Sequence, residues 1–316
     1  MIKIFEVING GLLTTVQDLG RRGYQKYGLA VSGAADPYAH RMANVLVRNK
    51  ETAATLEVTL MGLKLKVLEP CLIAMTGGNL NPHVNGEPAP MWASFPVNVG
   101  DDIHFKGCSA GCRAYIAVAG GFKVADVLGS KSTDLAGHMG GMDGRALKRG
   151  DVIDVYDAND VLSGPTRKRL ASDLIPTYAD NIKVRVVLGP QDDSFTEAGI
   201  RTFFSSTYTV TKDSDRMACR LEGPVIEHAD SADINSEGMF FGAIQVPKNG
   251  LPILFQAGRP SVGGYTKIGG VITVDLPKVA QLKPIDKISF QQVTVEEAHA
   301  LLQEQERLFK LLQVSC

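Results

Sequence analysis

The sequence predicts a mainly β protein with a few helices, an α+β chain in two related β-rich halves. Its 33 glycines recur between short apolar runs, a spacing typical of many short strands rather than long helices. Only three segments keep helical periodicity. A pattern of Asp, any residue, Ile, any residue and an apolar residue opens a period-two alternation three times, at 101–105, 151–155 and 286–290. This recurrence indicates an internal duplication.

Two of the three helices are predicted inside the halves. Asp36 is a good N-cap followed by Pro37 at the first helical position. The apolar positions of this helix are Ala39, Met42, Ala43, Leu46 and Val47. A weaker candidate follows Gly189-Pro190-Gln191, with Asp193 or Ser194 as its cap. Its inward residues are expected to be Phe195, Ala198 and Phe203.

The third helix ends the chain, where Thr294 and Glu297 form a capping-box pattern ahead of an apolar stripe. Between the halves, residues 157–181 are polar, contain two prolines and lack periodicity, which is typical of a linker. The predicted organisation is an N-terminal domain over 1–160, a linker over 161–180, a C-terminal domain over 181–293 and a terminal amphipathic helix over 294–316.

The charge balance excludes two classes of partner. Lys plus Arg (33) nearly equals Asp plus Glu (34), and no basic stripe breaks the even distribution, so neither nucleic acid nor an anionic membrane is expected as a partner. Glu6, Asn9 and Asp18 interrupt the first apolar stretch before a signal-peptide core forms. No segment reaches 18 uncharged apolar residues. We therefore expect a cytoplasmic protein.

The cysteines indicate neither a disulfide framework nor a metal site. Five cysteines are an odd number for a secreted disulfide-rich chain. His104, Cys108 and Cys112 supply at most three ligands, and the glycines between them argue against one helical face. We predict no metal.

The run from Glu237 to Gly270 is the strongest candidate for a pocket wall, because polar side chains stand among short apolar strands and glycine turns. An acid, an amide and an amine lie within 31 residues here and suit recognition of an amide or carboxylate. We predict Glu237, Gln245 and Lys267 as catalytic residues, with Arg259 and Tyr265 as substrate-binding residues. Some of these positions are also compatible with ordinary strand surface.

Other polar loops offer further substrate-binding candidates. Lys131 and Ser132 could donate to a phosphate or carboxylate, although their loop lacks the glycine order of a Walker A motif. Arg145 ends a run with four glycines, which is typical of a mobile loop, and could clamp a carboxylate. Asp215 and Arg216 could bind a ligand or form an ion pair. The loop that leads into Asp36 could hold an anion at the helix N-terminus, but simple capping is the favoured interpretation.

Seven motifs follow one another along the chain: TTVQDLGRRGYQKYG, SGAADPYAHRMANVLV, LGSKSTD, GPQDD, SDRMACRLEGP, SEGMFFGAIQVPKNGLPI and GGYTKI. With them the chain resembles the biotin-dependent carboxyltransferase-like family, which includes the C subunit of 5-oxoprolinase (the Kip inhibitor antagonist) and allophanate hydrolase subunit 2. The resemblance spans roughly residues 10–290. It implies two cyclophilin-like β-barrel domains, in agreement with the duplication.

The resemblance also implies an activity and partners. It implies one component of an ATP-dependent 5-oxoprolinase complex that opens 5-oxo-L-proline to L-glutamate, with ATP bound in a component that the sequence does not identify. The implied partners are a small Kip-inhibitor-type protein (the B subunit of the complex) and a lactam-utilisation-type protein (its A subunit). Two alternatives stay open. One is a regulatory antagonist that sequesters a Kip-type inhibitor of a sensor histidine kinase; the other is a biotin-dependent carboxyltransferase or allophanate hydrolase component, the only case that involves biotin.

Overall fold

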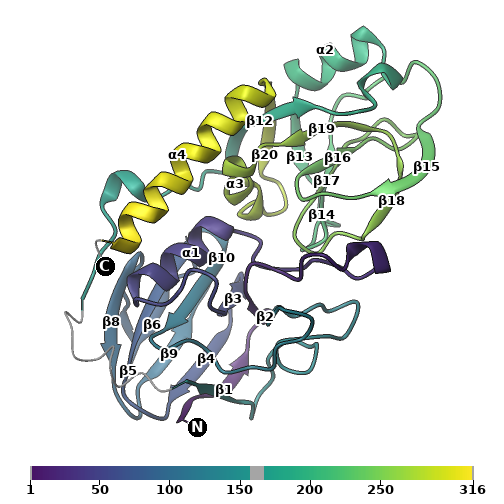
Figure 1. Cartoon of the computed structure of the whole chain (residues 1–316). Coiled ribbons are helices and arrows are strands. Elements are labelled where there is room, and N and C mark those ends of the chain that lie inside the picture. The colour runs from purple at the N-terminus through teal and green to yellow at the C-terminus, as the bar shows by residue number, and fades with distance from the viewer. Residues whose placement is uncertain (1, 157–166, 315–316) are drawn as a thin grey trace. The chain divides into compact units, whose positions relative to one another are not determined.

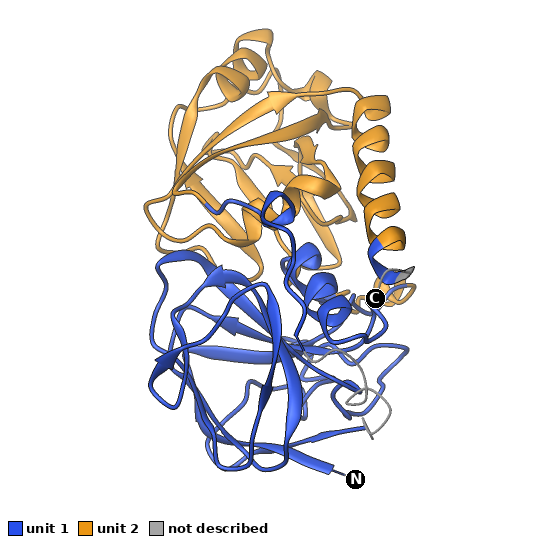
Figure 2. Cartoon of the chain, turned by 90° about the vertical axis from the view of Figure 1, so that its left-hand side faces the viewer, with its two compact units in different colours: residues 1–22, 32–178, 312–316 blue, residues 23–31, 179–311 orange. Residues whose placement is uncertain are grey.

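The computed structural model describes residues 2–156 and 167–314. These residues form two compact units, each assembled mainly from strands (Figures 1 and 2). Unit 1 comprises residues 1–22, 32–178 and 312–316, and unit 2 comprises 23–31 and 179–311. The mainly β fold class with a few helices is therefore confirmed. The predicted domain boundary at 160/161 lies outside the described residues.

Unit 1 contains two sheets around one apolar core. The first sheet has the order β11-β1-β4-β9-β6-β7 and the second β2-β3-β10-β5-β8. The strands are β1 Ile2–Gly10, β2 Leu13–Gln17, β3 Thr55–Thr59, β4 Leu63–Val67, β5 Cys71–Asn79, β6 Pro82–Val84, β7 Glu87–Pro88, β8 Ala93–Val97, β9 Asp102–Phe105, β10 Ala110–Val118 and β11 Val152–Val155. Fully buried residues such as Phe5, Leu56 and Ile116 belong to its core.

Helix α1 (Pro37–Leu46) lies in unit 1, where it contacts β5 and β10. The carboxylate of Asp36 accepts the amide proton of Ala39 (2.8 Å), and Pro37 occupies the first helical position. The capping prediction is therefore confirmed. All five predicted apolar positions are buried.

Part of the stretch predicted as a linker pairs with the edge of unit 1. The amide of Ser94 on β8 donates to the carbonyl of Lys168 (2.8 Å), and the amide of Leu170 donates to the carbonyl of Trp92 (2.9 Å). The described part of this segment up to residue 178 belongs to unit 1. A polar, proline-containing segment can still pair through its backbone, which side-chain periodicity does not reveal.

Unit 2 is a closed barrel with the strand order β12-β19-β16-β17-β14-β13-β20, next to a separate two-stranded sheet of β15 and β18. The strands are β12 Asn181–Leu188, β13 Thr207–Val210, β14 Ala218–Glu222, β15 Asp233–Gly238, β16 Ala243–Gln245, β17 Ile253–Phe255, β18 Val262–Tyr265, β19 Lys267–Val271 and β20 Lys287–Gln292. The barrel core includes Val184, Ile244 and Ile288. The β15/β18 pair is the green two-stranded sheet beside the barrel in Figure 1, and its two strands are separated in the chain by β16 and β17.

The remaining helices are α2 (Glu197–Ser205), α3 (Leu276–Ala280) and α4 (Val295–Val314). Thr196 caps α2 by accepting the amide of Gly199 (2.9 Å), so the predicted caps Asp193 and Ser194 are wrong; both lie in a preceding 3-10 turn. Ala198 is exposed, and Gly199 takes the inward position because its Cα lies against the backbone of Glu227.

The capping box predicted for the last helix is confirmed. The amide of Thr294 donates to the carboxylate of Glu297 (2.8 Å), and the amide of Glu297 donates to the hydroxyl of Thr294 (3.2 Å).

The three Asp-x-Ile copies share one turn, which the first copy illustrates. Asp101 donates its amide to the carbonyl of Asn98 (3.1 Å), and its carboxylate accepts the amide of Asn98 (2.8 Å). Gly100 and Asp101 then exchange hydrogen bonds with the backbone of Val67, both 2.9 Å. The same four bonds recur around Lys148, Gly150, Asp151 and Val7, and around Lys283, Ile285, Asp286 and Val210.

The third residue of each of these turns has a positive φ, which favours glycine. Gly100 has φ 88° and Gly150 has φ 87°, but the third copy places Ile285 at φ 75°. A β-branched residue in this conformation is strained. Each turn leads directly into a strand, β9, β11 or β20, as the repeat predicts.

Candidate functional site

The strongest cluster of polar side chains lies on one wall of the unit 2 barrel, where β16 and β19 pair. The register places Gln245 opposite Lys267 on these neighbouring strands. Gln245 lies between Ile244 and Val246, which are both fully buried in the barrel core, so by the alternation of side chains along a strand it faces away from that core. The register shifts at this point of the pair, and the side of Lys267 is shown instead by its ion pair with Glu237 of β15, outside the barrel sheet. Gln245 and Lys267 are still almost completely buried, at 3% and 2% exposure.

The two-stranded sheet of β15 and β18 contributes a carboxylate to this wall. The ammonium group of Lys267 forms an ion pair with Glu237 of β15, whose side chain is 42% exposed. The contact with Lys267, assisted by a hydrogen bond from Gln191, holds the pKa of Glu237 below its ordinary value. Beyond this ion pair the buried Nζ of Lys267 makes no hydrogen bond to the described residues. An ammonium group carries three donors, so this buried group uses fewer donors than it has.

The side-chain amide of Gln245 is oriented by the same two-stranded sheet. Its Nε2 donates to the carbonyl of Tyr265 (3.0 Å), while residue Tyr265 is 39% exposed. Gly263 of β18 lies directly against this amide, because a Cβ at that position would be 2.6 Å from the Gln245 Nε2. The backbone of β18 can approach Gln245 this closely only because residue 263 has no side chain.

Two further side chains of unit 2 bind the backbone directly after β15 and directly before β18. Arg259 is buried and donates from Nε to the carbonyl of Met239 (3.2 Å), with its guanidinium 5.7 Å from the centroid of the Phe241 ring. Gln25 donates from Nε2 to the same carbonyl (2.6 Å) and to the carbonyl of Ser261 (2.9 Å). Residues 23–31 thus group with unit 2, although the chain on either side belongs to unit 1.

This arrangement combines a buried ammonium, an ionised carboxylate and a fixed amide within one wall. The ammonium can stabilise a developing negative charge or deliver a proton, and the carboxylate beside it can accept one. The structure thus brings together Glu237, Gln245, Lys267 and the Tyr265 backbone, four of the predicted positions. Arg259 instead donates to the backbone carbonyl of Met239, directly after β15.

Lys131 and Ser132 lie in unit 1 and are already engaged there. The Nζ of Lys131 lies 4.7 Å from the centroid of the Tyr156 ring. Ser132 is fully buried and donates to the Asp18 carboxylate (2.5 Å). Burial opposes the ionisation of Asp18, but hydrogen bonds from Ser132, the Lys131 amide and Ser130 keep its pKa below the ordinary value. The donors of this loop are therefore already occupied by the carboxylate of Asp18 in the same unit, and the loop is not part of the site.

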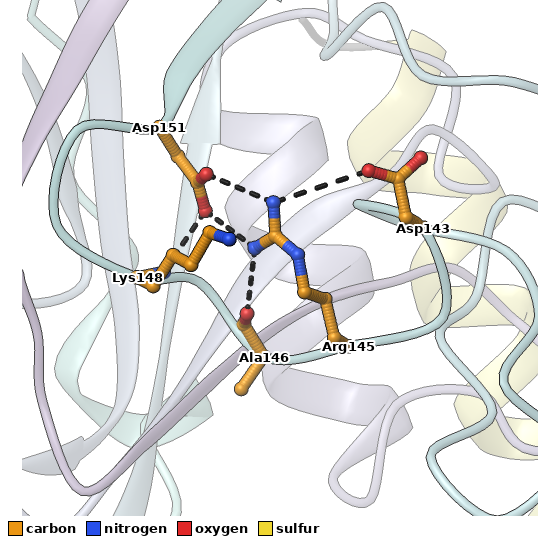
Figure 3. A network of polar contacts seen from close by, with 5 residues as sticks. All are labelled: Asp143, Arg145, Ala146, Lys148 and Asp151. Atoms are coloured by element: carbon orange, nitrogen blue, oxygen red, sulfur yellow. Dashed lines mark hydrogen bonds and ion pairs between the residues drawn. The ribbon is translucent and has the colours of Figure 1, made fainter.

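Arg145 is held by its own neighbours in unit 1 (Figure 3). Its two terminal nitrogens donate to the two carboxylate oxygens of Asp151, at 2.7 and 2.9 Å. Asp143 lies 3.9 Å away and the carbonyl of Ala146 accepts at 3.0 Å. The hydrogen bonds to Asp151 raise the pKa of Arg145. Because the planar fork already holds a carboxylate, the predicted clamp on a substrate is not supported.

Asp215 serves a turn in unit 2. Its carboxylate accepts the amides of Met217 (2.7 Å) and Ala218 (3.1 Å). The carbonyl of the adjacent Arg216 accepts the amide of Gly258 (3.0 Å). These bonds connect the SDRM segment to the end of β17, which is a structural role for the backbone.

The N-terminus of α1 is filled by the protein itself, which agrees with the favoured interpretation. The buried carboxylate of Glu57 accepts the amide of Ala35 (2.8 Å) and the hydroxyl of Tyr115 (2.9 Å). Tyr115 in turn accepts the amide of Asp36 (2.7 Å). An external anion would have to displace these groups.

His40 lies near this buried network and was not singled out from the sequence. Its Nδ1 lies 2.8 Å from the Thr55 hydroxyl, and its Nε2 is buried without a hydrogen-bond partner among the described residues. Burial lowers the pKa of His40 to about 4. The imidazole is therefore neutral at pH 7.

Gln191 is the site residue that sequence reasoning missed. It follows Gly189 and Pro190 in a turn and contacts both Lys267 and Glu237. The GPQDD motif contains it, but a glutamine in a turn carries no period that would place it beside a strand 76 residues away.

No three His, Cys, Asp or Glu side chains within residues 2–156 and 167–314 are grouped so that they could hold a metal ion. In the same part of the chain, no helix is both long and apolar enough to cross a membrane.

The chain matches the protein-family model of the carboxyltransferase domain, subdomain A and B, over residues 27–292. It is 32% identical over 309 residues to the C subunit of 5-oxoprolinase from Escherichia coli K12, and the match covers 98% of this chain and 97% of that protein.

Urea amidolyases are also similar to the chain but are much longer. Urea amidolyase of Lachancea kluyveri is 34% identical over 329 residues, which cover 98% of this chain and 18% of that protein. The crystal structure of the K. lactis urea amidolyase superimposes with a TM-score of 0.92 at 32% identity, covering 99% of this chain and 20% of that one.

Proposed function

Because the chain belongs to the carboxyltransferase-domain family, subdomains A and B, we propose that it is the C subunit of an ATP-dependent 5-oxoprolinase complex. The complex opens 5-oxo-L-proline to L-glutamate with hydrolysis of ATP. Near full-length similarity to a 5-oxoprolinase C subunit supports this choice over the longer relatives, of which the chain spans about a fifth. The observation that carries the proposal is the buried Lys267 ammonium, held by Glu237 beside the Gln245 amide.

The chemistry of the lactam explains why such a site is needed. A five-membered amide resists hydrolysis, and transfer of a phosphoryl group from ATP to its oxygen gives a better electrophile. Water then adds to the carbonyl carbon, and the ring C–N bond breaks as the nitrogen takes up a proton, which leaves an acyl phosphate. A second water hydrolyses the acyl phosphate to the carboxylate and free phosphate. In this proposal Lys267 gives the nitrogen its proton and Glu237 accepts one in return. Gln245 offers an amide to the substrate amide.

ATP is a substrate of the proposed complex, and we do not assign it to this chain. The Lys131 loop lacks a phosphate-binding motif, and its side chains are engaged with Tyr156 and Asp18. The proposed partners are the small Kip-inhibitor-type protein and the lactam-utilisation-type protein, the B and A subunits of the complex, which would supply the remaining groups.

Reconstitution tests the proposal. The chain is combined with both partner proteins, and glutamate release from 5-oxoproline and ATP is measured. We expect ATP-dependent turnover, and the proposal is lost if the complete mixture shows none. In Lys267→Ala the turnover falls by about 10²-fold or more, while size-exclusion chromatography still shows the complex.

The matched control is Lys248→Ala. Lys248 is an exposed lysine that forms an ion pair with Asp233 of β15. Its loss therefore removes an ammonium and an ion pair without changing the wall. Turnover of this variant should remain at the wild-type level. A purely regulatory antagonist of a Kip-type inhibitor would form the complex but have no turnover for either variant to reduce.

A second candidate function is carboxyl transfer from carboxybiotin carried by another protein. The family model and the urea amidolyase relatives favour it. Binding of free biotin by the isolated chain, measured by calorimetry, would support this candidate, and its absence together with 5-oxoproline turnover would exclude it.

A further inference from the structure

Gln191 stands in a turn that is fixed to the strand carrying Lys267. The amide of Gly189 donates to the carbonyl of Ile268 on β19 (3.0 Å). A side chain at position 189 would overlap the backbone carbonyl of Lys267, so the glycine permits this close approach. The turn closes on itself through a bond from the Ser194 amide to the Gln191 carbonyl (3.1 Å).

The side-chain amide of Gln191 uses both of its polar ends in the wall. Its Oε1 accepts the backbone amide of Lys267 (3.3 Å), and its Nε2 donates to Oε1 of Glu237 (2.9 Å). A backbone N–H can only donate and an ionised carboxylate can only accept. The orientation of the amide is therefore determined by its two partners.

Glu237 needs such support more than Lys267 does. Lys267 is buried within a barrel strand, whereas Glu237 belongs to a two-stranded sheet whose register shifts between Asp233 and Glu237. Its side chain is 42% exposed and that of Lys267 only 2%, so packing restricts the conformation of Glu237 less than that of the ammonium it meets.

We infer that Gln191 is a positioning residue, which holds the Glu237 carboxylate against the Lys267 ammonium and so sets the geometry for proton transfer. The inference rests on the proposed function for its catalytic consequence. The alternative is that Gln191 only ties its turn to β19, which would require the bond to the Lys267 backbone but not the bond to Glu237.

Gln191→Glu separates these two roles. The new side chain has the same shape and keeps an oxygen for the Lys267 amide, but it replaces the donor to Glu237 by a second negative charge. Gln292→Glu is the matched control, because it makes the same change of charge at an exposed position of β20 in the same unit.

The reconstituted complex provides the first measurement. If Gln191 positions Glu237, kcat of Gln191→Glu falls by about 10-fold to 100-fold. The acidic limb of its pH–rate profile also moves to higher pH, since loss of the donor disfavours the ionised carboxylate. Gln292→Glu should match the wild type in both respects. Turnover and a pH profile unchanged in Gln191→Glu would overturn the inference.

A measurement on the isolated full chain keeps the two proposals distinct. Carbon-13 NMR of labelled glutamate follows the titration of Glu237 in the wild type, in Gln191→Glu and in Gln191→Ala. An upward shift of the midpoint in both variants supports the positioning role even if the complex fails to turn over 5-oxoproline. A midpoint that stays at the wild-type value in both variants contradicts it.

Discussion

At the scale of single residues, burial gives ordinary side chains unusual properties in this protein. Lys267 is 2% exposed and His40 is fully buried, although both residue types normally contact water. The lysine has a carboxylate partner, and the histidine avoids the cost of a buried charge by staying neutral.

His40 makes the stability of unit 1 depend on pH. Its folded-state pKa of about 4 lies below the ordinary value of 6.5, so the unfolded chain binds the proton more readily. The unfolding free energy therefore falls as the pH decreases from about 6.5 towards 4, by about 2 kcal/mol between pH 7 and pH 5. The measurement is urea unfolding followed by the fluorescence of Trp92, the single tryptophan, which is buried in the same unit.

His40→Gln is the comparison for this pH dependence. The pKa of His104 is also lowered by burial, but His104 is present in both proteins, so the difference between them isolates His40. The variant should lose most of the decrease between pH 7 and pH 5. An equal decrease in both proteins would contradict the assignment.

Gly263 tests whether the orientation of Gln245 matters. A methyl group there would come within 2.6 Å of the Gln245 Nε2 and 2.7 Å of the Met239 Sδ, so Gly263→Ala must displace the amide. We expect kcat/KM for 5-oxoproline to fall by about 10-fold or more.

The control for Gly263→Ala is Gly238→Ala on the partner strand, where an added Cβ meets no atom within 4 Å. Its kinetics should match those of the wild type. Equal losses of kcat/KM in both variants would point to a general disturbance of the β15/β18 sheet instead of a specific effect on Gln245.

At the scale of elements, one four-residue turn is used three times to begin a strand. Its third position requires a positive φ, and two copies satisfy this with Gly100 and Gly150. The third copy carries Ile285, whose side chain is 81% exposed and so gains little from packing. The strain at this position is local to the turn.

Changing the third residue in two of the copies tests this interpretation. Ile285→Asn should stabilise unit 2 by about 1 kcal/mol, because Asn tolerates the left-handed conformation better than a β-branched residue does. Gly100→Ile should destabilise unit 1 by about 1 to 2 kcal/mol through the backbone, since a Cβ there has open space.

Circular dichroism follows the unfolding of the Ile285→Asn protein, and Trp92 fluorescence follows that of Gly100→Ile. A destabilised Ile285→Asn would show that the isoleucine contributes more than the turn geometry indicates.

At the scale of the whole molecule, each unit closes around an apolar core of its own. The sequence was informative about this organisation because strands, turns and caps are local. Period-two alternation, the Asp-x-Ile turns and the capping signals of Asp36 and Thr294 depend on neighbours within a few residues. It was less informative about α2, where the backbone of Glu227 decides which residue faces inward.

The sequence by itself determined the fold class, the three strands that open with the Asp-x-Ile pattern, two helix caps and the stretch in which Glu237, Gln245 and Lys267 lie. Only the tertiary structure decided which polar residues share a site. Lys131, Ser132 and Arg145 have suitable chemistry but are already bonded to Tyr156, Asp18 and Asp151, whereas Gln191 joins the site from a distant turn. The physical reason is that hydrogen-bond partners and burial depend on strand pairing between segments far apart in the chain, which local residue patterns do not encode.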